Sequence, residues 1–361
     1  MQCKIAPGAG LQPPVYQIDE GFMTQARSKP PAPQEATLRT WVLRTLFLLV
    51  AAGLLYLSLA GLDWHAFLAA LLAISPYWLA ASLACQLVAL LVRAARWSIL
   101  LAPETGRCVT AAFVGEAIGD LGNSFLPARA GEAARSVWLA RFLGARLSFV
   151  VGTAAVERVS DAVFLAVVTF MLMLTVPHVP LWLMAAAGVF LLLGLAALGV
   201  LFFLSAFSHL FTRLAKRLHL PHKLAHRGVG ILHEIGTGSR SLWHHPVRTA
   251  AYVVLTAAMW VSDAVAILYL AHAFRDSLDF PQALLFLAAL GLSSAIPSTP
   301  GYIGIFQFVA VAVLVPFGLS RADALAIVLV YQATAILQQL VWGGLGWSLL
   351  RYRRGGARAG D

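Results

Sequence analysis

Apolar stretches of about 20 consecutive residues recur along this chain, and a helix of that length is what crosses the hydrocarbon core of a bilayer. Hydrophobic residues make up 60% of the sequence and charged residues 12%, which excludes a soluble globular fold. The sequence therefore predicts an all-α polytopic membrane protein.

Six of the apolar stretches are continuous, and two are interrupted by proline and glycine. The six predicted spans are Trp41 to Ala60, Pro76 to Leu101, Leu147 to Val176, Trp182 to Leu204, Thr249 to Ala271 and Asp323 to Leu350. The interrupted stretches, Val109 to Leu126 and Pro281 to Phe317, are predicted re-entrant helical hairpins, because irregular backbone is tolerated at membrane depth only where it is buried or lines a cavity. Together they form a single transmembrane domain at residues 40–350.

Basic residues outside the spans set the orientation, because loops rich in lysine and arginine stay in the cytoplasm. We expect a disordered, proline-rich cytoplasmic tail at residues 1–39, a basic amphipathic cytoplasmic segment at 205–248 and a basic cytoplasmic tail at 351–361. The connection at 275–279 has no positive bias and is predicted to lie outside. The net charge of +10 suits an anionic cytoplasmic leaflet better than nucleic acid, which is not an expected partner.

The stretch from residue 116 to 161 places many ionisable groups at membrane depth. Charge in hydrocarbon costs several kcal/mol, so these groups must face one another, water or a substrate headgroup. The candidate lipid-headgroup site consists of Glu116, Asp120, Asn123, Arg129, Glu132, Arg135, Glu157, Arg158 and Asp161. An alternative is that Glu157, Arg158 and Asp161 form an internal ion cluster that holds helices together.

The two interrupted stretches share a pattern. Residues 123–131 align with residues 293–301, with Ser, an aliphatic residue, Pro and Gly at identical spacing. One hairpin is entered from the cytoplasm and the other from outside, so the halves 40–176 and 181–350 are predicted to form an inverted repeat. Helix N-termini at such breaks can attract an anion such as phosphate. The residues assigned to the breaks are Pro127, Gly131, Pro297, Pro300, Gly301, Gly304 and Gln307.

Other polar residues of the spans have simpler interpretations. Arg93 and Arg96 share a helical face near the end of a span and are interpreted as snorkelling interfacial arginines, with headgroup contact as the alternative. Three glutamines of the last span, Gln332, Gln338 and Gln339, are expected to join helices by hydrogen bonds.

Asp263 is a membrane carboxylate without an obvious role and is a candidate for proton coupling. His222 and His226 have the spacing of helical metal ligands, but no carboxylate or thiol cluster accompanies them. No metal site and no cofactor are therefore predicted.

Three motifs in order resemble the transmembrane region of lysylphosphatidylglycerol synthases, a flippase-like membrane family. They are Leu-Pro-x-Arg-x-Gly-Glu-x-x-Arg at 126–135, Glu-Arg-x-x-Asp at 157–161 and Pro-x-x-Pro-Gly-x-x-Gly at 297–304, and the resemblance covers roughly residues 40–350. It implies that the signature positions of the family are Arg129, Glu132, Arg135, Glu157, Arg158, Asp161, Pro300, Gly301 and Gly304.

The sequence departs from the family pattern in two respects. Gln307 stands where the family often has a glutamate, and the sequence ends at Asp361 without the soluble aminoacyl-transferase domain of the full synthases. Synthase activity is therefore not implied.

The resemblance implies a protein that moves or presents a lipid: an anionic or aminoacylated phospholipid, a hopanoid or a polyprenyl-linked lipid. In the leading hypothesis, a lipid translocase, Arg129, Arg135 and Arg158 attract a phosphate. One alternative is an integral enzyme that transfers a group to a lipid headgroup with Glu157 or Asp161 as general base, although no catalytic motif is found. Another is a non-catalytic scaffold of a lipid-synthesis complex. Lipid-synthesis enzymes and a second copy of the chain are further candidate partners.

Overall fold

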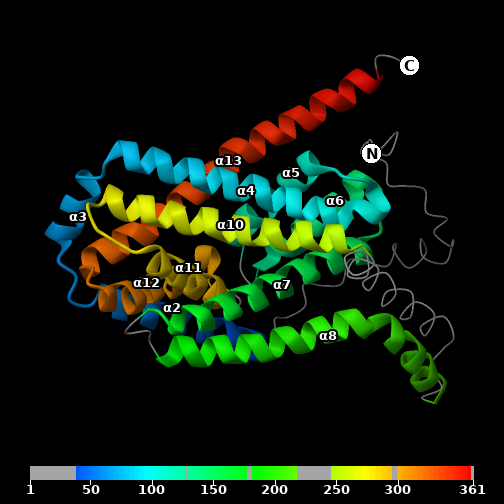
Figure 1. Ribbon diagram of the computed structural model, residues 1–361, viewed down its shortest axis with the longest axis horizontal. Helices are drawn as coiled ribbons and strands as arrows, with labels where there is room; N and C mark the ends of the chain where they lie inside the picture. The colour runs from blue at the N-terminus through cyan, green and yellow to red at the C-terminus, as the bar shows by residue number, and fades with distance from the viewer. Residues whose placement is uncertain (1–37, 127–128, 177–180, 218–244, 295–298, 359–361) are drawn as a thin grey trace.

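The structure, a computed structural model, describes residues 38–126, 129–176, 181–217, 245–294 and 299–358 (Figure 1). Every regular element in these ranges is a helix, which confirms the predicted all-α fold class. The helices are α2 (Leu38–Leu59), α3 (Trp64–Leu72), α4 (Pro76–Thr105), α5 (Val109–Phe125), α6 (Ala130–Leu143), α7 (Leu147–Met173), α8 (Leu181–Arg217), α10 (Pro246–Ala273), α11 (Phe280–Ser294), η2 (Pro300–Tyr302), α12 (Ile305–Leu314), η3 (Val315–Phe317) and α13 (Arg321–Arg358).

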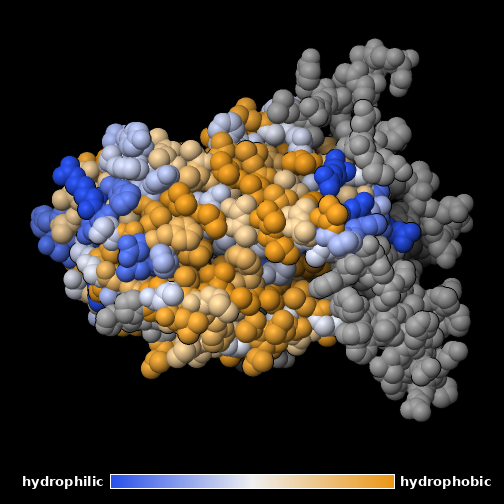
Figure 2. Space-filling view, in the orientation of Figure 1, coloured by the Kyte–Doolittle hydropathy of each residue, from blue (hydrophilic) through white to orange (hydrophobic). Residues whose placement is uncertain are grey.

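Five helical segments of the described ranges are long and apolar enough to cross a membrane, and a sixth span results if a bent pair is counted as one. The five are Pro76–Thr105, Leu181–Val200, Pro246–Ala273, Pro300–Phe317 and Arg321–Ser348, and the bent pair is Leu49–Leu59 with Trp64–Leu72. Figure 2 shows a broad hydrophobic band across the molecule with hydrophilic residues at both ends, as expected for a surface that contacts lipid.

Helix α7 was predicted as a span, and its 27 residues would reach about 40 Å. Glu157, Arg158 and Asp161 lie near its middle, so its central part carries more charged residues than the apolar windows of the five segments above. A helix of this kind is tolerated inside a membrane protein where its charges face other helices.

The long helices lie along the long axis of the molecule, so their connections gather at its two ends (Figure 1). One end carries α3 and the connection from α10 to α11, and the opposite end carries the connection from α4 to α5 and the start of α10. This separation agrees with the predicted sides of the loops. Which end faces the cytoplasm stays a prediction.

Two helix pairs, α5 with α6 and α11 with α12, turn at the predicted breaks, and their turns meet. The Arg129 Nη2 atom donates to Ser294 Oγ at 3.0 Å, and Gly301 lies against the Ser124 carbonyl. Pro127 and Pro297 lie outside the described residues. The re-entrant arrangement and the inverted repeat stay predictions.

The two turns use left-handed backbone at different positions. In the first turn Arg129 has a φ of 57°, and in the second turn Gly301, Tyr302 and Gly304 have φ values of 66°, 58° and 91°. These residues do not align in the sequence repeat, where Arg129 corresponds to Thr299 and Gly301 to Gly131. The two breaks thus resemble each other in sequence, but aligned residues do not share the same backbone conformation.

Gly131 is required by the close approach of α5 and α6. A Cβ atom at this position would lie 2.5 Å from the Asn123 backbone nitrogen and still closer to the Gly119 carbonyl oxygen. On the facing helix, a Cβ at Gly122 would lie 2.5 Å from the Gly131 Cα. Because backbone atoms cannot yield as a flexible side chain can, only glycine fits here.

A relay of amides stabilises the second break. The Gly304 N–H donates to Gln307 Oε1 at 2.7 Å, Gln307 Nε2 donates to Gln332 Oε1 at 2.9 Å, and Gln332 Nε2 donates to the Gly301 carbonyl at 2.8 Å. Gln307 is buried and acts as both donor and acceptor. Gln332 therefore joins α13 to the break by hydrogen bonds, as predicted.

Three boundaries differ from the predicted ones. Helix α3 was not anticipated; it follows a bend of 84° and is capped by Asp63, which accepts hydrogen bonds from the His65 and Ala66 amides. Helix α13 continues to Arg358, into the predicted basic tail. Helix α8 includes the first part of the predicted segment 205–248, of which residues 218–244 lie outside the described ranges.

The hydrogen-bond relay predicts the effect of placing a glutamate at position 307. Gln307→Glu replaces the donor to Gln332 by a buried carboxylate oxygen, so we expect the free energy of unfolding to fall by about 1–3 kcal/mol. The matched control is Gln282→Glu, because Gln282 also accepts a backbone N–H, that of Asp279, through its Oε1 atom, and this hydrogen bond is exposed. Thermal unfolding in detergent measures both variants. Equal midpoints for the two would contradict the relay.

Candidate functional site

Arg135 on α6 lies at the centre of a buried charge network. Its guanidinium contacts three carboxylates: Glu116 at 2.7 Å, Glu132 at 2.7 Å and Glu157 at 3.1 Å. It also lies over the ring of Trp97, 4.4 Å from the centroid, and its side chain is completely buried. Glu132 and Arg135 lie three residues apart on α6, a spacing at which helical side chains can pair. With every side of the guanidinium occupied, a headgroup cannot reach Arg135 in this conformation.

Arg96 on α4 neutralises the acidic face of α7. Its Nη2 atom lies 2.7 Å from Glu157 Oε1, and the guanidinium also forms an ion pair with Asp161 through Nη1. Its side chain is 0% exposed. The snorkelling interpretation of Arg96 is therefore wrong, because α7 supplies carboxylates at the same depth and the side chain turns inward to them.

A count of charges could have found this arginine. The predicted site holds five carboxylates, on Glu116, Asp120, Glu132, Glu157 and Asp161, but three arginines, on Arg129, Arg135 and Arg158. Carboxylates buried at membrane depth need positive partners. Arg93 and Arg96, one helical turn apart on α4, supply the two that are missing.

Arg158 and Glu132 form the part of the network that a ligand can reach. The Arg158 Nε atom lies 2.8 Å from Glu132 Oε1, and its Nη1 atom lies 3.9 Å from Asp161 Oδ2. The side chains of Arg158 and Glu132 are 31% and 22% exposed. They therefore form an accessible edge on a network whose other members are buried.

Two predicted residues lie at the turn between α5 and α6. Arg129 caps α6, and its Nε atom is buried without a hydrogen-bond partner among the described residues, although Nη2 donates to Ser294. Asn123 is buried where α5 approaches Gly131. Asn123 thus serves the packing of the two helices in this conformation.

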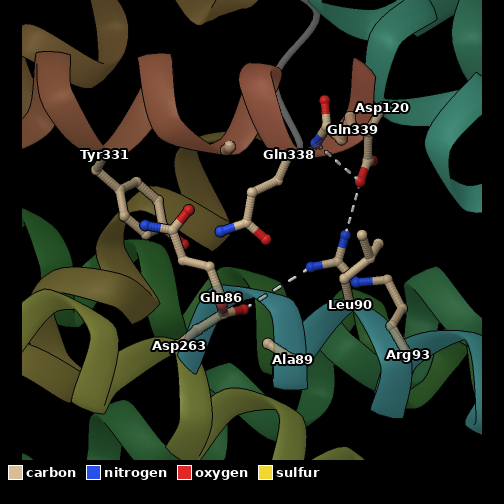
Figure 3. Close-up of a pocket in the computed structure, with 10 residues that line it drawn as sticks. Gln86, Ala89, Leu90, Arg93, Asp120, Asp263, Tyr331, Gln338 and Gln339 are labelled. Atoms are coloured by element: carbon tan, nitrogen blue, oxygen red, sulfur yellow. Dashed lines mark hydrogen bonds and ion pairs between the residues drawn. The ribbon is translucent and has the colours of Figure 1, made fainter. Parts of the chain in front are cut away.

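Asp120 belongs to a second polar group, together with Asp263. Arg93 lies between the two carboxylates, with Nη1 2.9 Å from Asp120 Oδ2 and Nη2 3.8 Å from Asp263 Oδ2 (Figure 3). Gln339 Nε2 donates to Asp120 at 3.3 Å, so this glutamine joins α13 to α5 as predicted. Because Arg93 is paired within the protein, the snorkelling interpretation is wrong for it too. Proton coupling by Asp263 stays a prediction.

The arrangement links the helices that carry it. Glu157 binds arginines of two other helices and so joins α7 to both α4 and α6. Asp120 in the same way joins α5 to α4 and α13. Over the described part of the chain, no three His, Cys, Asp or Glu side chains gather as in a zinc site.

Residues 44–343 match the model of the family described as lysylphosphatidylglycerol synthase TM region. The chain belongs to this family. The match contains both breaks and both polar groups, and membership is consistent with a membrane protein that acts on lipids. No curated protein and no solved structure matches the chain.

Loss of Arg96 should destabilise this family member strongly. Arg96→Gln leaves Glu157 with one cation and Asp161 with the distant Arg158, so we expect the free energy of unfolding to fall by about 3–5 kcal/mol. The double variant Arg96→Gln/Asp161→Asn should recover part of that loss, because it removes one uncompensated charge.

The matched control is Arg141→Gln, since Arg141 is exposed on α6. Thermal unfolding in detergent should leave the midpoint of this variant near that of the parent protein. If Arg96→Gln behaved as Arg141→Gln does, the network would not contribute to stability as argued.

Proposed function

We propose that the protein is a lipid translocase, which moves a phospholipid, aminoacylated lipid, hopanoid or polyprenyl-linked lipid across the bacterial inner membrane. The observation that carries the proposal is the accessible edge formed by Arg158 and Glu132 on a buried charge network. A lipid headgroup bearing phosphate is the ligand whose chemistry fits an accessible arginine at this depth. Family membership supports a role with lipids.

Arg158 can exchange its partner at low cost. Glu132, which binds Arg158 at 2.8 Å, also binds Arg135 at 2.7 Å. When Arg158 turns from Glu132 to a phosphate, Glu132 therefore keeps one cation. The guanidinium presents two parallel N–H donors to a phosphate, a geometry that lysine cannot reproduce.

Arg129 is the second arginine that a headgroup could meet. It lies one turn before Glu132, at the N-terminus of α6, and its Nε atom has no partner among the described residues. A helix N-terminus adds favourable dipole interaction with an anion. We therefore assign phosphate contact to Arg158 and Arg129, and we assign to Arg135 the positioning of Glu132 and Glu157.

The meeting of the two turns suggests how access could alternate. Arg129 and Ser124 of one helix pair contact Ser294 and Gly301 of the other. In transporters built from broken helices, movement of one unit against the other opens a central site first to one side and then to the other. Separation of these turns would open the space beside the charge network in the same way.

The enzyme alternative receives less support from the geometry. Glu157 and Asp161, the candidate general bases, are both paired with Arg96. A general base needs to reach the proton that it removes, and a buried carboxylate held by arginine is poorly placed to do so. The scaffold alternative accounts for buried ion pairs that hold helices together, but it gives no reason for the accessible edge of Arg158 and Glu132.

Substitution of Arg158 tests the proposal. Arg158→Gln should lower the translocation rate about tenfold or more, because it removes a charge-assisted contact worth about 1.5–3 kcal/mol. Arg158→Lys should have an intermediate rate. The thermal midpoint of Arg158→Gln should stay near that of the parent protein, because Glu132 keeps Arg135.

Translocation is followed in vesicles that contain fluorescently labelled phosphatidylglycerol, by dithionite quenching of the label in the outer leaflet. Arg141→Gln serves as the control and should retain the parent rate. An undiminished rate in Arg158→Gln would overturn the assignment of the accessible edge to the headgroup.

A further inference from the structure

A small polar cavity lies between α4, α5, α10 and α13, beside the charge network (Figure 3). Its volume is about 60 Å³, enough for a few water-sized species. Its polar lining includes Gln86, Arg93, Asp120, Asp263, Gln338 and Gln339.

Three amide oxygens of this lining, on Gln86, Gln338 and Gln339, lack a donor among the described residues. Gln86 and Gln338 are 7% and 6% exposed, and their Oε1 atoms are buried without a hydrogen-bond partner among the described residues. Figure 3 shows the amide of Gln338 pointing into the space between Tyr331 and Arg93. A buried acceptor without a donor costs about 1–3 kcal/mol, so three of them in one cavity indicate an occupant that interacts with oxygen.

The hydrogen bonds of the Gln86 and Gln338 amide nitrogens fix which amide atom is the oxygen. Gln338 Nε2 donates to the Leu83 carbonyl at 2.8 Å, and a carbonyl can only accept. Gln86 Nε2 donates to the hydroxyls of Thr334 at 3.0 Å and Ser82 at 3.4 Å, and both hydroxyls already donate to backbone carbonyls. Reversing either amide would place its oxygen against an acceptor.

The charges of the lining do not balance. Asp120 and Asp263 face the cavity with one cation, Arg93, which leaves one formal negative charge. The Asp263 carboxylate lies 3.8 Å from Arg93, farther than the Asp120 carboxylate at 2.9 Å. Asp263 is nevertheless buried, with 5% of its surface exposed. An unbalanced carboxylate at this depth calls for a positive partner.

We infer that this cavity binds a small inorganic cation, Na⁺, through oxygen atoms of Asp263, Gln86 and Gln338. Hard cations of this kind take carboxylate and amide oxygens as ligands. The cation balances the surplus charge and also gives the amide oxygens of Gln86 and Gln338 a partner, whereas water would satisfy these oxygens and leave the charge. This site does not depend on lipid translocation, because it follows from the cavity alone.

Bound Na⁺ would join three helices. Gln86 lies on α4, Asp263 on α10 and Gln338 on α13, so a shared ion holds these helices together where Arg93 also meets α5 through Asp120. The site is thereby placed to make the packing of α5 respond to the ion.

The test uses the purified full chain in detergent, with Na⁺ exchanged for N-methyl-D-glucamine at constant ionic strength. Between no Na⁺ and about 150 mM Na⁺ the thermal midpoint should rise by roughly 3 °C. The rise should be absent in Asp263→Asn and in Gln338→Leu. It should persist in Asp279→Asn, a control in the connection between α10 and α11. A variant that folds poorly would give no clear midpoint. Binding is therefore also measured on the parent protein, by the ²³Na NMR relaxation rate.

Three results would overturn the assignment. The first is a thermal midpoint that does not change when Na⁺ is added, together with a ²³Na relaxation rate that does not change when the protein is added. The second is a rise produced by lower pH in the absence of Na⁺ and lost in Asp263→Asn, which would place a proton on Asp263 instead. The third is a rise with methylammonium but not with Na⁺, which would indicate an organic amine. None of these measurements follows lipid movement, so their failure leaves the translocase proposal untouched.

Discussion

The pairing of Glu157 with Arg96 and Arg135 is the interaction on which the rest of the structure depends. Glu157 is buried midway along α7, and its two partners come from α4 and α6. A single carboxylate in hydrocarbon is unstable, and two arginines there would be no better. Together they hold three helices in one arrangement, and they leave Glu132 and Arg158 as the accessible edge of the network. The stability of the core and the position of the candidate site thus have the same origin.

Hydropathy was sufficient to predict the all-α membrane fold and most helix positions, because span length and apolar composition are local properties. The motifs also identified Glu132, Arg135, Glu157 and Asp161, which the structure brings together. The roles of Arg93 and Arg96 could not be read from their own helix, because they depend on which helices become neighbours. The excess of carboxylates over arginines was the available signal. The need for glycine at 131 likewise comes from the contact of two backbones, which spacing does not reveal.

The proposed translocase and the proposed ion site use different parts of one polar interior. The headgroup contacts are assigned to Arg158 and Arg129, beside the turn between α5 and α6. The cation is assigned to Asp263 and two glutamines, between α4, α10 and α13. Helix α5 takes part in both groups, through Glu116 to Arg135 and through Asp120 to Arg93. A change in the packing of α5 would therefore alter both the charge network around Arg135 and the cavity beside Arg93.

The central claim is that lipid moves when the two turns separate, and a cross-link between them tests it most directly. The variant would carry Ser124→Cys and Tyr302→Cys, one near each turn, and its three native cysteines would be replaced by residues without a thiol. Lipid translocation in vesicles would be compared before and after treatment with a short, cleavable bifunctional reagent. The account predicts that cross-linking stops translocation and that cleavage of the reagent restores it. Translocation at the same rate in the cross-linked protein would contradict the account.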